Sequence, residues 1–176
     1  MSPRTPSTLI FFDTSALIPF LVDSDPLHPR LVHSLRSSPH HYVIDTIVLA
    51  EYLAKIPTAD YASVLARFQK TFRIQPFSEL SAQLFAELFK VLDAHGHIPR
   101  TPTGRQVVKA DLMVLSSAIA SGVSEFYFDD RGFSSWSAFL PLTFLGLPLP
   151  HFVCLSNLPP APVQGVIPLP PSPPSP

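Results

Sequence analysis

Acidic side chains are scarce in this chain, and several stand where they could do chemistry. The 176 residues include only 13 Asp and Glu. Asp13 follows the apolar run Leu-Ile-Phe-Phe, and Asp129 and Asp130 follow Phe-Tyr-Phe. Both groups therefore stand at the C-terminal ends of predicted buried strands, where open parallel sheets place their ligand crevice. The alternative for Asp13 is a structural role as the cap of a helix that begins near Ser15.

Two further acids interrupt helices that are apolar on nearly all sides. Glu51 lies between Ile-Val-Leu-Ala and Tyr-Leu-Ala, and Asp111 is flanked by Val, Ala, Leu and Met residues. Glu51 could simply pair with Lys55 one turn later, and Asp111 could simply be a favourable charge early in its helix. Burying an unpaired carboxylate is costly, so we favour compensation by a divalent cation. Clustered carboxylates without His or Cys spacing suit Mg²⁺ or Mn²⁺ rather than zinc.

Composition excludes several other classes of protein. The single cysteine, Cys154, excludes an internal disulfide framework and a multi-cysteine zinc site. A formal net charge of −1 argues against nucleic-acid binding by bulk charge alone. Neither glycine-rich signature of a dinucleotide or P-loop site is present. The longest early apolar run is too short to span a bilayer and lacks a signal-peptide cleavage pattern, so we expect a cytoplasmic protein with no membrane contact.

Short apolar runs alternate with helical periodicity along most of the chain. This alternation predicts an α/β fold: one three-layer α/β/α domain with a mostly parallel central sheet. Strands are expected at residues 9–12, 41–44, 73–76 and 126–128 and within 142–155, and helices at 26–37, 46–56, 58–72, 78–94, 106–120 and 133–140.

A proline-rich segment marks the expected domain boundary. Nine of the 22 prolines lie between Pro159 and Pro176. Proline lacks an amide donor and has a fixed φ, so this stretch cannot form helix or central strand. We predict a folded domain over residues 1–157 and a disordered tail over 158–176. The alternative is that the tail is a polyproline ligand for an aromatic-lined groove.

Four short motifs, taken in order, resemble those of the PIN-domain family. The match extends from residue 8 to about residue 150. The motifs are Phe-Phe-Asp13-Thr14-Ser15-Ala-Leu, Val-Leu-Ala-Glu51-Tyr-Leu, Lys109-Ala-Asp111, and Phe-Asp-Asp130-Arg-Gly-Phe133. PIN proteins are metal-dependent ribonucleases and include the VapC-type toxins of toxin–antitoxin pairs.

The resemblance implies a site and an activity. It implies that four carboxylates are the catalytic and metal-holding residues, with Mg²⁺ or Mn²⁺ as cofactor, and that RNA is cut to leave 5′-phosphate and 3′-hydroxyl ends. These four are Asp13, Glu51, Asp111 and Asp130. Thr14, Ser15 and Asp129 are expected to support them. The family's last motif usually reads Thr-x-Asp-x-x-Phe, and here Phe128 replaces the hydroxyl, so Asp129 could substitute for it in part.

Basic residues close to the site suggest how RNA would bind. Arg100, Arg105 and Lys109 lie in a stretch without any acid between Ala94 and Ala110. We expect them to contact RNA phosphates, the alternative being a solvated loop. An antitoxin protein and a second copy of the chain, in a homodimer, are further candidate partners.

The sequence thus predicts a metal-dependent endoribonuclease, with the toxin of a VapBC-type pair as the specific form. The alternative is a non-catalytic PIN-like module that binds proteins through its Pro-rich tail or an apolar face.

Overall fold

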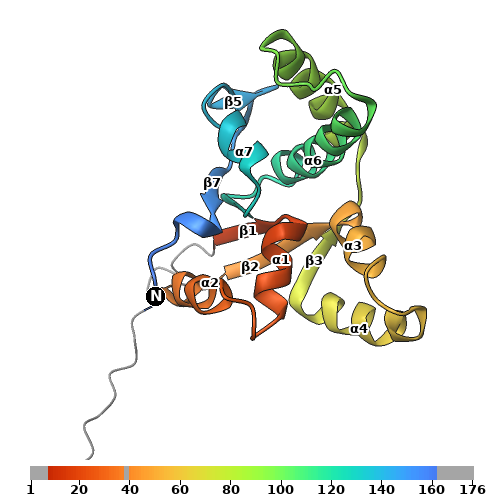
Figure 1. Cartoon of the computed structure of the whole chain (residues 1–176), viewed down its shortest axis with the longest axis vertical. Coiled ribbons are helices and arrows are strands. Elements are labelled where there is room, and N and C mark those ends of the chain that lie inside the picture. The colour runs from red at the N-terminus through yellow and green to blue at the C-terminus, as the bar shows by residue number, and fades with distance from the viewer. Residues whose placement is uncertain (1–7, 38–39, 162–176) are drawn as a thin grey trace, which may run out of the picture.

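A five-stranded parallel sheet forms the centre of the computed structural model, which describes residues 8–37 and 40–161 (Figure 1). The strands lie in the order β3-β2-β1-β4-β7, and each neighbouring pair is parallel. Their bounds are β1 (Thr8–Phe12), β2 (His40–Asp45), β3 (Phe72–Gln75), β4 (Glu125–Phe128) and β7 (His151–Cys154). The predicted α/β class and the mostly parallel sheet are confirmed.

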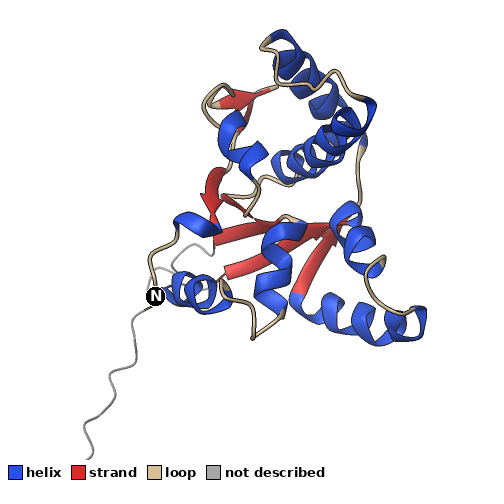
Figure 2. Ribbon diagram, in the orientation of Figure 1, coloured by secondary structure: helices blue, strands red, loops and turns tan. Residues whose placement is uncertain are grey.

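Helices cover both faces of this sheet (Figure 2). The chain enters a helix or a short 3₁₀ turn after each strand, which gives the βαβ alternation that parallel strands require. The α-helices are α1 (Thr14–Leu21), α2 (His28–Ser34), α3 (Thr46–Leu53), α4 (Tyr61–Thr71), α5 (Glu79–Ala94), α6 (Pro102–Ala120) and α7 (Arg131–Trp136). The 3₁₀ turns are η1 (Leu35–Ser37), η2 (Thr58–Asp60) and η3 (Leu155–Asn157), and a small antiparallel hairpin joins β5 (Thr143–Phe144) to β6 (Leu147–Pro148).

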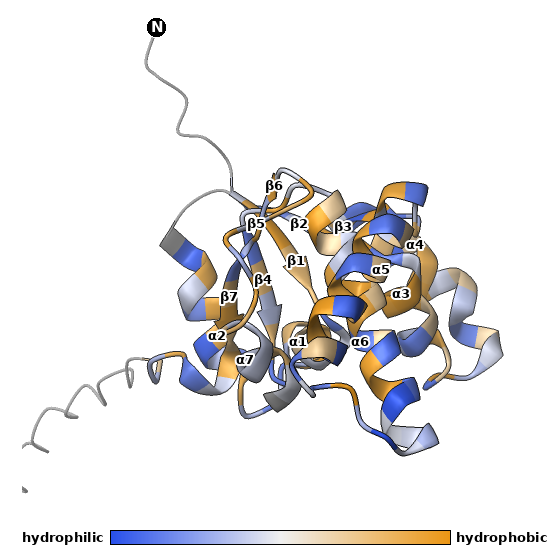
Figure 3. Cartoon of the chain, turned by 90° about the horizontal axis from the view of Figure 1, so that it is seen from above, coloured by the Kyte–Doolittle hydropathy of each residue, from blue (hydrophilic) through white to orange (hydrophobic). Residues whose placement is uncertain are grey.

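Phenylalanine dominates the core. Phe11 and Phe12 of β1 and Phe126 and Phe128 of β4 are almost completely buried. Phe126 meets Phe133 edge to face, with ring centroids 5.0 Å apart. Each such side chain contributes roughly 1.5–3 kcal/mol by leaving water. Apolar residues accordingly gather along β1 and in the middle of the molecule, and hydrophilic residues on the outer turns of the helices (Figure 3).

The last long helix begins earlier than the sequence suggested. We expected a polar loop up to Arg105, whereas α6 starts at Pro102. Thr101 caps it by accepting a hydrogen bond from the amide of Gly104 at 3.3 Å, and proline is favourable in a first helical turn because its missing amide has no partner there. Arg105 and Lys109 are therefore helical residues. The cap and the proline outweighed the polar composition that indicated a loop.

Other element boundaries differ by smaller amounts. The helix expected over residues 26–37 is α2 followed by η1, and the helix expected over residues 58–72 begins as η2 and gives way to β3 at Phe72. The predicted tail begins just after η3, and most of it lies outside the described residues, so the boundary at residue 157 stays a prediction. No helix in the described part of the chain is both long and apolar enough to cross a membrane.

Candidate active site

The predicted acids converge on one end of the sheet because β1 and β4 are neighbours. Phe12 pairs with Tyr127 in the parallel register, so the residues after both strands emerge at the same edge. The amide of Asp13 donates to the carbonyl of Tyr127 at 2.9 Å, which extends this pairing by one residue. The sheet thereby brings Asp13 close to the Asp129–Asp130 pair, at the C-terminal edge where open parallel sheets bind ligands.

Asp13 combines the two roles that its sequence position allowed. Its side chain is 7% exposed and caps α1, with Oδ2 accepting from the Ser15 amide at 3.0 Å and from the Ser15 hydroxyl at 2.6 Å. Burial raises the pKa of Asp13, although the hydrogen bonds from Ser15 and Thr14 oppose the shift; the negative charge of Glu51 adds to it. The cap orients this carboxylate beside a second acid.

Glu51 reaches the same region from α3. Its Oε2 accepts a 2.5 Å hydrogen bond from the Thr14 hydroxyl, which joins α3 to the first residue of α1. Glu51 forms no ion pair with Lys55, so the surface interpretation of this acid is wrong within the part of the chain that the structure describes. Thr14 therefore holds the Glu51 carboxylate in a fixed position next to Asp13.

The pKa of Asp111 shows most directly that the four acids repel one another electrostatically. Burial is the largest cause that raises its pKa, to about 7, and the charges of Asp13, Asp130 and Glu51 follow in that order. Such repulsion needs the carboxylates to lie near each other in a poorly solvated region. Four acids from four separate segments of the chain therefore share one electrostatic field.

Asp129 and Asp130 point to different parts of the molecule. Asp130 caps α7 by accepting from the Gly132 amide at 2.5 Å. A Cβ at Gly132 would lie 2.9 Å from that same carboxylate oxygen, so glycine permits the contact. Asp129 instead accepts from the Ser156 amide at 2.9 Å and from the Ser156 hydroxyl. Its carboxylate thus ties η3 to the end of β4, while Asp130 remains with the other acids.

Asp129 still contributes to the site through its backbone. Its amide donates to the Ser15 hydroxyl at 2.8 Å, and that hydroxyl donates to Asp13. Ser15 consequently bridges the ends of β1 and β4. The Phe128 ring, which replaces the family's hydroxyl, is buried against Phe126 and Phe133 and offers no hydrogen bond.

The three predicted RNA-contacting residues are not equivalent. The Arg105 guanidinium lies over the Phe89 ring, 5.4 Å from its centroid, and is thus held against α5. Arg100 is exposed just before α6, and Lys109 is half-buried two residues before Asp111. Of the three basic residues, Lys109 is the nearest in sequence to an acid of the site, Asp111.

One acid of this edge was not singled out from the sequence. Asp45 ends β2, is completely buried, and caps α3 by accepting from the amides of Ile47 at 3.0 Å and Val48 at 2.8 Å. Burial raises its pKa, with Glu51 adding to the shift. The sequence signal that could have identified Asp45 is its context: Ile-Asp45-Thr ends one apolar run just as Phe-Asp13-Thr ends another.

The second oxygen of Asp45 is unusual. In residues 8–37 and 40–161, neither Asp45 Oδ2 nor the Ser117 hydroxyl has a hydrogen bond of good geometry. The Ser117 hydroxyl nevertheless lies near enough to lower the pKa of Asp45. Two buried polar groups on β2 and α6 therefore face each other below the acid cluster without a well-formed bond.

The donor set suits a hard divalent cation. It consists of carboxylate oxygens, and their mutual repulsion would be relieved by a positive ion. As the side chains stand, the described residues include no group of three Asp, Glu, His or Cys placed to coordinate one ion. The carboxylates are instead held by Thr14, Ser15 and the Gly132 amide. The chemistry of the residues fits a metal.

Comparison with known proteins defines the class. The family profile of the PIN domain matches residues 10–137, so this chain belongs to the PIN domain family. No curated protein matches it significantly.

Solved structures share this fold at low sequence identity. A chain of the VapBC2 complex from Rickettsia felis, bound to a promoter DNA fragment, superposes with a TM-score of 0.56 and 18% identity over 84% of this chain and 98% of that one. VapBC-1 from nontypeable Haemophilus influenzae has a TM-score of 0.58 and 11% sequence identity, and the match covers 85% of this chain and 100% of that one. Mycobacterium tuberculosis VapC20, described as a sarcin-ricin loop cleaving toxin, has a TM-score of 0.50 and 20% sequence identity, and the match covers 74% of this chain and 96% of that one. At these identities the likeness establishes the fold.

Proposed function

We propose that this protein is a metal-dependent endoribonuclease of the VapC type. The observation that carries the proposal is the gathering of the four acids: burial, and then the charges of Asp13, Asp130 and Glu51, raise the pKa of Asp111 to about 7. Perturbed carboxylates gathered at the ligand-binding edge of an α/β sheet are typical of functional sites. Membership of the PIN family supports the same conclusion.

Asp13, Glu51, Asp111 and Asp130 would hold Mg²⁺ or Mn²⁺. A bound ion of this kind supplies a water of lowered pKa and neutralises charge on the phosphodiester during in-line attack. The chain's own polar groups position the acids: Thr14 holds Glu51, and Ser15 holds Asp13 against the end of β4. Cleavage would leave 5′-phosphate and 3′-hydroxyl ends.

Membership of the PIN family also supports proposals about the partners of this protein. Arg100 and Lys109 would contact RNA phosphates, whereas Arg105 would first have to leave the Phe89 ring. Because similar structures come from VapBC complexes, we propose an antitoxin protein as a partner and the cytoplasm as the location. A homodimer remains part of the proposal.

Nuclease activity is tested with mixed RNA and purified protein, with Mn²⁺ in one arm and excess chelator in the other. We expect cleavage only with the ion, and 5′-phosphate ends that permit direct ligation of an adapter. Equal cleavage in both arms, or none with either Mg²⁺ or Mn²⁺, contradicts the proposal.

A non-catalytic binding module is the second candidate, favoured by one observation: the buried Phe128 ring stands in place of the family's hydroxyl. The two candidates differ in metal binding, because a ligand that binds only the folded state raises the melting temperature. The nuclease should melt higher in millimolar Mn²⁺. An unchanged melting temperature favours the binding module.

A further inference from the structure

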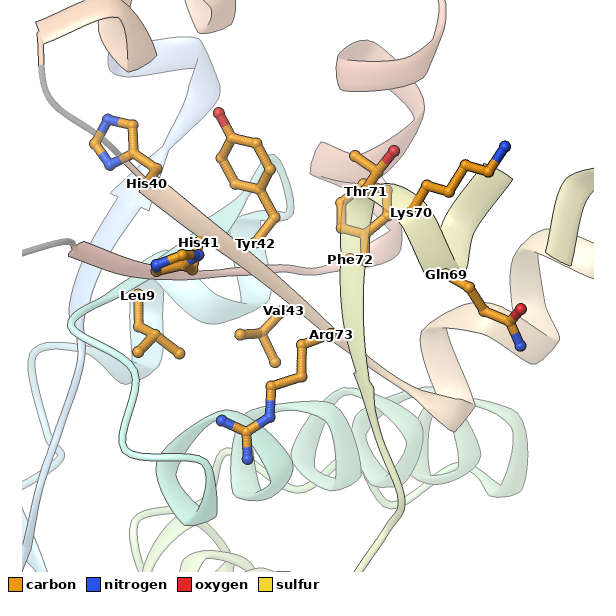
Figure 4. A pocket seen from close by; sticks show the side chains of 10 residues that line it. All are labelled: Leu9, His40, His41, Tyr42, Val43, Gln69, Lys70, Thr71, Phe72 and Arg73. Atoms are coloured by element: carbon orange, nitrogen blue, oxygen red, sulfur yellow. The ribbon is translucent and has the colours of Figure 1, made fainter. Parts of the chain in front are cut away.

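A cavity lies at the opposite end of the sheet from the acids. It has a volume of about 780 Å³ and lies where β2 and β3 begin (Figure 4). β3 starts at Phe72, which pairs with Tyr42, so His40 and His41 extend beyond the start of β3. The end of α4, which includes Lys70, closes the far side. We call this cavity the β2–β3 notch.

Basic groups line the notch without any acid among them. His40, His41, Lys70 and Arg73 contribute to its wall, and the remaining lining residues are uncharged. None of the four forms an ion pair with Asp or Glu inside the described ranges. Both ring nitrogens of His40 are buried there, with no hydrogen-bond partner among residues 8–37 and 40–161. The wall therefore carries positive and hydrogen-bonding groups that the described protein does not satisfy.

Ordinary structural roles account for only part of this set. Lys70 lies in the last turn of α4, where a cation is favourable beside the free carbonyl groups. That explanation does not apply to Arg73, because it lies on β3. With the Gln75 amide turned so that its oxygen faces Arg73, the guanidinium donates to that oxygen and keeps its charge. Neither histidine lies on a helix.

The basic groups lie on both sides of β2. Figure 4 shows the rings of His40 and Tyr42 on one side of the strand, and His41 and Arg73 on the other. A single phosphate ion could not reach both sides. A polymer that carries one negative charge per nucleotide and passes across the notch could contact several of these groups at once.

We propose that the β2–β3 notch binds the sugar–phosphate backbone of single-stranded RNA, at a site separate from the acids. The inference rests on the proposed RNA substrate. Asp45 lies five residues after His40 along β2, about 16 Å of extended strand, so an RNA strand that occupies both sites must extend over several nucleotides. The exposed side chains of Arg73 and His41 provide the phosphate contacts on one side of β2, and the exposed Lys70, at the end of α4, provides a further one.

Binding is measured apart from cleavage, by fluorescence anisotropy of a short labelled single-stranded RNA in excess chelator. Arg73→Gln should raise the Kd roughly three- to tenfold and reduce the slope of log Kd against log salt by about 0.7, the value for one lost contact to a single strand. Lys70→Gln and His41→Gln provide second and third variants. All three side chains are exposed, so the substitutions should leave the fold intact, and the melting temperatures of the variants verify this.

The matched control is Arg67→Gln, which removes an exposed arginine of α4 that does not line the notch. Equal Kd values and salt slopes for Arg73→Gln and Arg67→Gln overturn the inference. Competition by inorganic phosphate as strong as that by unlabelled RNA overturns it too and marks a site for the free anion. Because no cleavage is needed, these outcomes are independent of the Mn²⁺ test of nuclease activity.

Discussion

The two ends of β2 hold charge in opposite ways. At the C-terminal end, Asp45 is completely buried, and the neighbouring acids are held by hydroxyl and amide donors. At the N-terminal end, His41 and Arg73 are exposed, and the side chain beside the Arg73 guanidinium is the neutral amide of Gln75. The acids are therefore positioned before any ligand arrives, whereas the basic groups can adjust to it.

This difference has an energetic consequence. Carboxylates packed together away from water raise one another's pKa and reduce the stability of the fold when they are ionised. Exposed charges cost little and are screened by salt. The acidic end should therefore respond strongly to pH and to cations, and the basic end to ionic strength. The predictions below test that contrast, beginning with the largest effect.

Neutralising Asp13 should have the largest effect. Asp13→Asn should reduce RNA cleavage at saturating Mn²⁺ by more than about a hundredfold, since even outer-shell partners of a metal cost ten- to a hundredfold. The fold should survive because asparagine is an equally good helix cap. The initial rate of cleavage is the measurement. Asp25→Asn is the matched control: Asp25 accepts from the Leu27 amide at 2.8 Å and does not perturb Asp111, so its rate should match the wild type.

The two adjacent acids after β4 should differ. Asp130→Asn should abolish cleavage, because Asp130 acts on the pKa of Asp111, whereas Asp129→Asn should lower it by roughly tenfold or less. Cleavage rates of both variants at saturating Mn²⁺ decide the order. If Asp129→Asn is the inactive variant, the carboxylate bonded to Ser156 in the free protein must turn toward the substrate.

Asp111 should make the metal-free protein less stable as pH rises. Its pKa rises from 3.8 to about 7 on folding, so the native state binds the proton more tightly than the unfolded state. The stability that this proton provides is full below about pH 4 and is lost as the pH passes 7. Asp111→Asn should therefore melt about 3 °C higher than wild type at about pH 8, and the difference should vanish in acid.

Thermal melting in chelator across this pH range measures the effect. Saturating Mn²⁺ should reverse the ranking at about pH 8, because the ionised carboxylate is then the favoured form. A difference between the variants that does not change with pH would show that packing, not charge, separates them.

The smallest effect is expected at the buried pair below the cluster. Asp45→Asn keeps the cap of α3 and adds an amide donor that can reach the Ser117 hydroxyl. Because the pKa of Asp45 is raised, the fold favours a neutral side chain there, and the variant should melt about 2 °C higher at about pH 8. Ser117→Ala should change the melting temperature by about 1 °C or less. A lower melting temperature for Asp45→Asn would mean that the charge stabilises the start of α3.

Much of the architecture could be predicted from local pattern. Apolar runs followed by helical periodicity indicated β1, β2 and β4 and most of the helices, because burial of one helix face or of a whole strand leaves a clear repeat. The predicted start of α6 was four residues too late, because a threonine cap and a proline begin the helix inside a segment whose polar composition indicated a loop. Local composition is a weak guide wherever a cap decides the boundary.

The sequence singled out some acids of this site and missed another. Glu51 and Asp111 could be singled out because each interrupts an apolar helix, where a lone acid is costly to bury, and both are partly buried in the structure. The role of Asp45 was not singled out, although its Ile-Asp-Thr context repeats the Phe-Asp-Thr of Asp13. A cap and an acid of the cluster look alike in sequence, because both follow a strand and precede a helix.

The sequence by itself indicated most strands and helices in their order along the chain, and the position of each acid at the end of a strand or inside a helix. These follow from periodicity and burial, which depend on near neighbours. Only the tertiary structure decided where Asp129 and Arg105 point. Asp129 bonds to Ser156, 27 residues further along the chain, and Arg105 lies on Phe89 of another helix. A side chain's direction is set by the partner that packing brings to it, and packing joins residues that no local pattern connects.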